Sequence, residues 1–321
     1  MASWQASVVS TFIRMMVKRR PEGAEAEVVK SIRSMLEVSK FIRSLIPPAV
    51  DTRMVSDVNS GAVKGEWIQS TSDPQQTVYY LHGGGYVACS PKTHRPFTSS
   101  LSRAANARVF ALDYRLAPEH RFPAPVEDAV AGYHWLLDQD VDPQEIVIGG
   151  DSAGGGLTIA TLVSLRDAGL PLPRAAFVIS PWTDMSCAGK SLDTNNECDP
   201  MFFAAGVRWM APVYVGAASP CDPLASPIYA DLSNLPPLLI HVSDTEVLLD
   251  DSVRLAERAK QFGVNVDLRI WKDLPHAWPV FVSFKLPESF RALGEIVEFI
   301  QNNSRRNDIT SRANQTINAS A

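Results

Sequence analysis

The sequence has few cysteines, no long apolar run and no long basic run, and each absence excludes a class of protein. Four of the 321 residues are cysteine, widely scattered, with neither C-x-x-C spacing nor the density of a disulfide framework. We therefore expect no metal, no cofactor and a reducing, cytoplasmic location. A net charge of -5 without a basic cluster also argues against a nucleic-acid partner.

The N-terminal segment is amphipathic, and its apolar stretch is too short and too interrupted to span a bilayer. Lys18-Arg19-Arg20 follows this stretch instead of preceding it, unlike the charges of a secretory signal. Apolar periodicity predicts one helix over residues 2–17 and a second over 23–46, which Pro47-Pro48 ends. An interfacial membrane helix is the alternative for the first of these, and we expect no stable membrane insertion.

Strand-like and helix-like segments then alternate along the chain, which predicts an α/β fold with a mostly parallel sheet covered on both faces. Residues 304–321 are polar without periodicity, so we expect a disordered tail. The predicted strands are 66–69, 77–81, 109–113, 145–149, 174–180, 238–242 and 266–271, and the predicted helices are 94–105, 125–137, 154–168, 250–262 and 288–301.

Gly150-Asp151-Ser152-Ala153-Gly154 fits the G-x-S-x-G nucleophile elbow. The motif alone is weak evidence, because glycine and serine are common in loops. Here it joins a predicted strand to a predicted helix, as a sharp turn that exposes a serine hydroxyl requires. Ser152 is therefore the candidate nucleophile. Asp151 flanks the turn, and we expect it to be a scaffold carboxylate.

His82-Gly83-Gly84-Gly85 follows the predicted strand 77–81. Backbone N–H groups without a neighbouring Cβ can approach the oxyanion that forms when a serine attacks an ester carbonyl. The residue after the nucleophile, Ala153, usually supplies a further N–H group. A flexible glycine turn is the alternative for this run, and the serine elbow argues against it.

The sequence contains six histidines, and His276 follows the last predicted strand. It is the only histidine after the candidate acids, as the order Ser…Asp/Glu…His requires. It is therefore the candidate general base. The remaining histidines have other predicted places: His82 holds the glycine run by hydrogen bonding, His94 and His120 lie in polar loops, and His134 and His241 are structural.

Four carboxylates follow the predicted strand 238–242 and could orient this histidine. Asp250 and Asp251 open the predicted helix 250–262, where acidic residues favour the positive end of the helix dipole. Asp244 and Glu246 therefore remain as alternatives.

Together these motifs resemble the hormone-sensitive-lipase-like (family IV) esterases of the α/β-hydrolase superfamily. The stretches 113–124 and 222–227 are also similar to hallmarks of that family. The resemblance implies an α/β-hydrolase fold with N-terminal cap helices over residues 1–48 and a catalytic domain over 49–303. A second part of the cap would lie at about residues 183–220. It also allows a homodimer, because family members often pair through a sheet edge.

The same resemblance implies site residues. Family members usually carry an Asp thirty residues before the histidine, and here that position holds Glu246. Glu246 is therefore the implied acid, with Asp244 as the alternative. The implied oxyanion donors lie among Gly83, Gly84 and Gly85, with Ala153.

The implied activity is that of a serine carboxylesterase acting on short- to medium-chain esters of small molecules through a Ser-His-Glu/Asp triad and an acyl-enzyme. A lactone hydrolase or small-molecule deacetylase is the alternative, and a non-catalytic receptor or a peptidase of the same fold is more distant. The bulky segment 201–210 predicts a lid helix, with ordinary packing as the alternative. The pocket candidates are Phe202, Phe203, Trp209 and Met210, with Trp182 and Trp278 as weaker candidates.

Overall fold

The computed structural model describes residues 2–18, 22–45, 55–61 and 63–303. The predicted helix end at Pro47-Pro48 and the predicted disordered tail at 304–321 lie outside these residues. No helix within the described ranges is long and apolar enough to cross a membrane.

The centre of the fold is an eight-stranded sheet in the order β1-β2-β4-β3-β5-β6-β7-β8. The pairs β1–β2 and β2–β4 are antiparallel and the remaining pairs are parallel, which confirms the predicted mostly parallel sheet. The strands are β1 (Val55–Ser60), β2 (Val63–Gln69), β3 (Gln76–Leu81), β4 (Ala107–Leu112), β5 (Ile146–Asp151), β6 (Ala175–Ile179), β7 (Leu238–Ser243) and β8 (Val266–Trp271). The strand β1 is not among the predicted strands, because this edge strand is polar and largely exposed.

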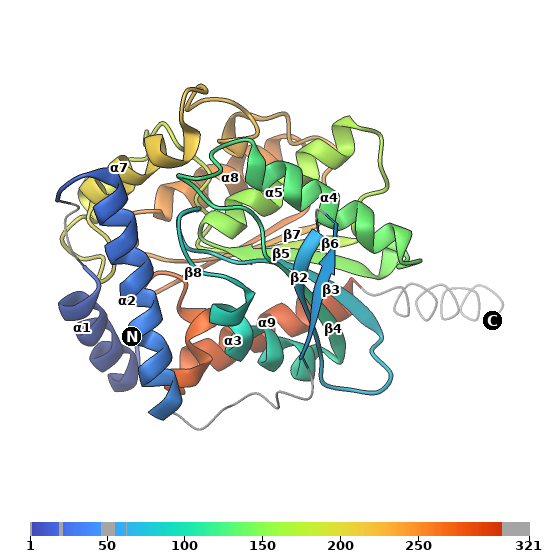
Figure 1. Cartoon of the computed structure of the whole chain (residues 1–321), viewed down its shortest axis with the longest axis horizontal. Coiled ribbons are helices and arrows are strands. Elements are labelled where there is room, and N and C mark those ends of the chain that lie inside the picture. The colour runs from blue at the N-terminus through green and yellow to red at the C-terminus, as the bar shows by residue number, and fades with distance from the viewer. Residues whose placement is uncertain (1, 19–21, 46–54, 62, 304–321) are drawn as a thin grey trace, which may run out of the picture.

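Helices cover both faces of the sheet, with α3 and α9 on one face and α4, α5 and α8 on the other (Figure 1). The covering helices are α3 (Pro91–Ala105), α4 (Ala124–Asp138), α5 (Ala153–Asp167), α8 (Leu249–Gln261) and α9 (Pro287–Asn302). Each corresponds to a predicted helix. Because parallel strands end at the same edge, the loops after β3, β5, β7 and β8 meet at the carboxyl ends of the strands.

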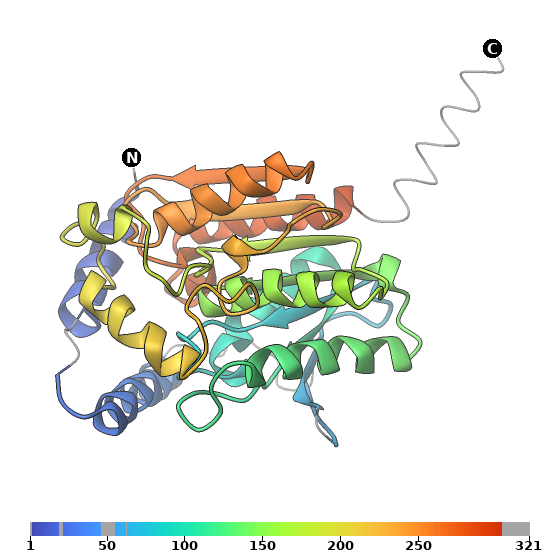
Figure 2. The ribbon, with the colours of Figure 1, turned by 90° about the horizontal axis from the view of Figure 1, so that it is seen from above.

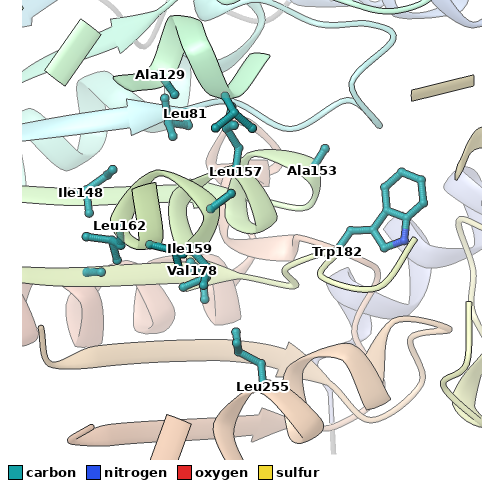
Figure 3. Close-up of a cluster of buried hydrophobic side chains, with 14 of the residues drawn as sticks. Leu81, Ala129, Ile148, Ala153, Leu157, Ile159, Leu162, Val178, Trp182 and Leu255 are labelled. Atoms are coloured by element: carbon teal, nitrogen blue, oxygen red, sulfur yellow. The ribbon is translucent and has the colours of Figure 1, made fainter. Parts of the chain in front are cut away.

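The helix α5 runs through the core between the sheet and its neighbouring helices, and almost every residue in it is buried. Figure 3 shows Leu157 beside Leu81 and Ala129, and Ile159 beside Val178. A fully buried leucine or isoleucine contributes roughly 1.5–3 kcal/mol relative to its exposed state. This packing fixes the first turn of α5, and with it the residue that precedes the helix, Ser152.

The remaining α-helices are α1 (Trp4–Met16), α2 (Glu25–Leu45), α6 (Ser191–Thr194) and α7 (Ala204–Val215). Figures 1 and 2 both show α1, α2 and α7 together on one side of the molecule. These helices and the segment 183–203 are called the cap below. The Arg14 guanidinium of α1 donates to the carbonyls of Glu197 and Cys198 at 2.7 and 2.8 Å. Lys18 Nζ donates to the carbonyls of Asn196 and Asp199 at 2.6 and 2.7 Å. These contacts join the two parts of the cap.

The helix α7 starts later than the predicted lid helix at 201–210. The carboxylate of the buried Asp199 accepts hydrogen bonds from the backbone N–H groups of Met201 and Phe202 at 2.7 and 3.0 Å. These bonds hold residues 201 and 202 in a turn, so the helix begins only at Ala204. The bulky side chains of this turn therefore do not belong to α7.

Candidate active site

Ser152 lies between β5 and α5 with φ 54° and ψ −122°, a conformation that is costly for a residue with a Cβ atom. Its backbone N–H group donates to Ile179 O at 2.8 Å, and its carbonyl accepts from Trp182 N at 3.0 Å. A Cβ atom on Gly154 would overlap the backbone of Leu81 and His82, so the turn requires glycine there. These contacts maintain the strained turn that the G-x-S-x-G motif predicts.

His276 lies in the loop after β8, and its ring faces the loop after β7. His276 Nδ1 is 2.6 Å from Glu246 Oε2, and both side chains are buried. The structure thus brings together Glu246 and His276, the acid and base that the resemblance implies. The other ring nitrogen, His276 Nε2, is buried and has no hydrogen-bond partner among the described residues.

A network of hydrogen bonds holds the Glu246 carboxylate. Its Oε1 atom accepts from Ser180 Oγ and from Ser243 N, each at 2.7 Å. Ser180 Oγ also accepts from Ala277 N at 3.1 Å, so it links the loops of the acid and the base. Sequence reasoning missed Ser180, although its position at the carboxyl end of β6 was a usable signal.

Asn195 and Asp199 hold the backbone around Glu246 from the cap. Asn195 Nδ2 donates to the carbonyls of Asp244 and Glu246 at 2.9 and 2.8 Å. The second carboxylate oxygen of Asp199 accepts from Val247 N at 2.9 Å. The cap therefore positions the loop that carries the acid.

The other candidate acids lie elsewhere. Asp244 Oδ1 accepts from Asp273 N at 2.9 Å, so this carboxylate stabilises the turn after β8. Asp250 and Asp251 lie in the first turn of α8, as predicted. Asp251 is buried, accepts from Thr183 N at 3.0 Å and has a pKa raised to about 7 by burial. None of these three carboxylates is hydrogen-bonded to His276.

The buried pair changes the proton affinity of the imidazole. Burial alone would lower the pKa of His276, but the charge of Glu246 and its hydrogen bond outweigh burial, so the pKa of His276 is raised above its usual value. An imidazole oriented in this way can accept a proton at Nε2, and the carboxylate stabilises the imidazolium that forms.

The N–H groups of the three glycines at 83–85 differ in whether they have a hydrogen-bond acceptor within the protein. Gly83 N donates to Asp151 Oδ1 at 3.0 Å, so Gly83 is not available as an oxyanion donor, contrary to its inclusion among the candidates. Among the described residues, no acceptor binds the N–H groups of Gly84, Gly85 or Ala153. Gly84 and Gly85 have φ values of 121° and 63°, which favour glycine.

Asp151 is a scaffold carboxylate, as its flanking position predicts. It is buried and accepts from Tyr80 Oη at 2.6 Å, while His94 Nε2 lies 3.3 Å from Asp151 Oδ1. Burial would raise the pKa of Asp151, but His94 and the hydrogen bonds hold it below its usual value. A carboxylate that stays charged keeps the Gly83 N–H group, and therefore the glycine run, in place.

The prediction that His94 lies in a polar loop is wrong. It is buried in the first turns of α3, where Pro91 occupies the first helical position. His82 Nδ1 lies 2.7 Å from Gly83 O, consistent with its predicted bond to the glycine run, and burial lowers the pKa of His82 to about 3.

A cavity of about 240 Å³ contains Ser152 and His276 in its lining. Of the four pocket candidates in the segment 201–210, two line this cavity. Phe202 and Met210 do, as does Trp182, and the Phe202 ring meets the His276 imidazole edge-on at 5.0 Å between centroids. The remaining lining is mostly apolar and includes Val17, Ile32, Met35, Val207, Leu248 and Val280.

The other three pocket candidates, contrary to the prediction, pack outside the cavity. The Lys18 ammonium lies over Phe203, 4.3 Å from the centroid of the phenylalanine ring. Trp209 packs against a cluster that includes Val29. Trp278 is fully buried against Trp271.

Residues 78–280 match the family described as the alpha/beta hydrolase fold. The chain belongs to this family. A crystal structure of an esterase from the bacterial hormone-sensitive lipase family is 43% identical to this hydrolase, with a TM-score of 0.84 over 94% of this chain and 99% of that one. The structure of EstE5 soaked with p-nitrophenyl butyrate is 42% identical, with the same TM-score and coverage.

An acetyl-hydrolase of Streptomyces hygroscopicus is 45% identical over 236 residues, which cover 74% of this chain and 79% of the relative. These matches show that the hydrolase is a carboxylic ester hydrolase of the hormone-sensitive-lipase-like type. Across its described ranges, no group of three or more His, Cys, Asp or Glu side chains is arranged to hold a metal ion.

Proposed function

We propose that this hydrolase cleaves short- to medium-chain carboxylic esters through Ser152, His276 and Glu246. His276 Nε2 removes the Ser152 proton as Oγ attacks the ester carbonyl, and the oxyanion is held by the N–H groups of Gly84, Gly85 and Ala153. The imidazolium then protonates the departing alkoxide, which leaves as an alcohol. His276 next deprotonates a water molecule that attacks the acyl-enzyme, and the carboxylic acid is released as the proton returns to Ser152.

The observation that carries this proposal is the 2.6 Å contact between His276 Nδ1 and Glu246 Oε2. It leaves Nε2 directed away from the acid and without a partner among the described residues. Ser152 and His276 line one cavity, in which an ester carbonyl would contact both. Catalytic hydrogen bonds often tighten only when substrate is bound, so the absence of a bond to Ser152 in the free enzyme agrees with this role.

The size of the cavity supports a preference for short acyl chains. Its volume of about 240 Å³ lies below the roughly 300–1,000 Å³ typical of sites for drug-sized ligands. The names of two relatives agree with this preference, since one is an acetyl-hydrolase and EstE5 was soaked with a butyrate ester. Phe202, whose ring lies 5.0 Å from the His276 imidazole, and Met210 belong to the apolar lining of this cavity.

A series of p-nitrophenyl esters tests both the activity and the chain-length preference. We expect kcat/KM to be highest for short acyl chains and to fall by about tenfold or more for dodecanoate, because the longer chain exceeds the volume of the cavity. Replacing Phe202 with alanine should shift the optimum toward longer chains. The matched control, Phe203→Ala, removes an equally large ring outside the cavity and should leave the chain-length profile unchanged. A flat profile, or equal shifts in both variants, would refute the assigned pocket.

A further inference from the structure

The helix α1 has apolar side chains on two faces, and only one of them packs against the protein. Ala6, Val9 and Ile13 are buried against the catalytic domain. Trp4 and Met15 are exposed by 74% and 67%. Spacings of four and eleven residues place side chains on one side of a helix. We call this side the outer face of α1; it consists of Trp4, Val8, Phe12, Met15 and Met16.

Large exposed apolar side chains gathered on one helix face are unusual on a protein surface that water covers. The charge of the surrounding sequence indicates which kind of partner would cover them. Residues 1–21 contain the cations Arg14, Lys18, Arg19 and Arg20 and no acidic residue, while the whole chain carries a net charge of -5. A helix with tryptophan on its apolar face, in a segment whose only charged side chains are cations, matches an interfacial helix that binds anionic lipid. The side chains of Arg14 and Lys18 are hydrogen-bonded to backbone carbonyls of residues 196–199, so their charges would attract the lipid surface without contacting it.

We propose that the outer face of α1 docks the hydrolase on an anionic lipid surface. Apolar side chains would enter the boundary between headgroups and acyl chains, while the positive charge of residues 1–21 would attract the anionic surface at longer range. A second copy of the chain fits the same face less well, because a twofold contact through α1 would bring the cations of both copies together. This proposal goes beyond the proposed catalytic mechanism and does not depend on it.

The place of α1 suggests what docking would accomplish. Val17, directly after α1, lines the cavity, as do Ile32 and Met35 of α2. Figures 1 and 2 show these two helices on the same side of the molecule. A lipid surface on α1 would therefore lie beside the wall of the cavity, and esters dissolved in that surface are the substrate class that docking would favour.

Sedimentation with lipid vesicles tests the proposal with the full chain. The native protein should sediment with vesicles of phosphatidylcholine and phosphatidylglycerol, less with phosphatidylcholine alone, and less as salt is added. The double variant Trp4→Ser/Met15→Ser should lower the partition coefficient by about tenfold or more, because it removes two of the inserted side chains. The single variant Val8→Glu, which places a negative charge on the same face, should have a similar effect.

The matched control is Phe262→Ser/Ile270→Ser, which removes two exposed apolar side chains from other surfaces, 38% and 51% exposed. This control should bind vesicles like the native protein, and all variants should hydrolyse p-nitrophenyl acetate equally, which shows that they fold. Absence of native binding to anionic vesicles would overturn the proposal, as would undiminished binding of both α1 variants. A native dimer that the α1 variants convert to a monomer, without vesicle binding, would assign the outer face to a second copy instead.

Discussion

Replacing Ser152 with alanine is expected to lower kcat for ester hydrolysis by roughly 10⁴-fold or more, because it removes the only group in the mechanism that forms the acyl-enzyme. The residual rate would come from binding and from the N–H groups of Gly84, Gly85 and Ala153, which the substitution leaves in place. KM should change little, since the methyl side chain fits within the space of the serine. Steady-state kinetics with p-nitrophenyl acetate measure both constants.

The matched control is Ser180→Ala, a buried serine at the end of the neighbouring strand. It loses the bonds that orient Glu246 and His276 but retains the nucleophile, so its kcat should fall much less than that of the Ser152 variant. Undiminished hydrolysis by the Ser152 variant would refute the mechanism.

Replacing Glu246 with glutamine is expected to lower kcat by about 10³- to 10⁴-fold, because the amide cannot stabilise the imidazolium and favours the wrong tautomer of His276. Asp244→Asn is the matched control, since it neutralises a carboxylate two residues away that caps the turn at Asp273. Its effect should be less than about tenfold. A collapse of kcat in the Asp244 variant alone would assign the acid to Asp244.

The pH profile gives a second measure of the same pair. Ester hydrolysis requires neutral His276, so kcat/KM should fall as pH decreases through the pKa of His276, which the Glu246 carboxylate raises. Because Glu246→Gln removes that charge, burial would then dominate and the acidic limb should move to lower pH. An acidic limb at the same pH in both proteins would show that Glu246 does not control the base.

The motifs in the sequence predicted the elements of the site better than the contacts between them. Ser152, the glycine run and His276 each follow a predicted strand, and the parallel arrangement brings those strand ends together. Local sequence is sufficient for this, because strand and helix periodicity extends over several residues on each side of the motif.

The missed features depend on side chains that meet across long sequence separations. Gly83 donates to Asp151, 68 residues away, so its loss as an oxyanion donor could not be read from the glycine run alone. The roles of Ser180 beside Glu246 and of Asp199 beside Val247 also depend on such contacts. The misplacement of His94 has a local reason: α3 begins at Pro91, because proline is favourable at the first position of a helix, so His94 lies inside the helix.

The central claim is that Ser152 becomes the covalent nucleophile when neutral His276 removes its proton. Intact-mass measurement after brief treatment with a serine-directed organophosphonate, followed by peptide mapping, tests it most directly. We predict one adduct per chain, located on Ser152, and strongly slowed labelling in His276→Ala. An adduct on another residue, or unchanged labelling of Ser152→Ala, would contradict the account.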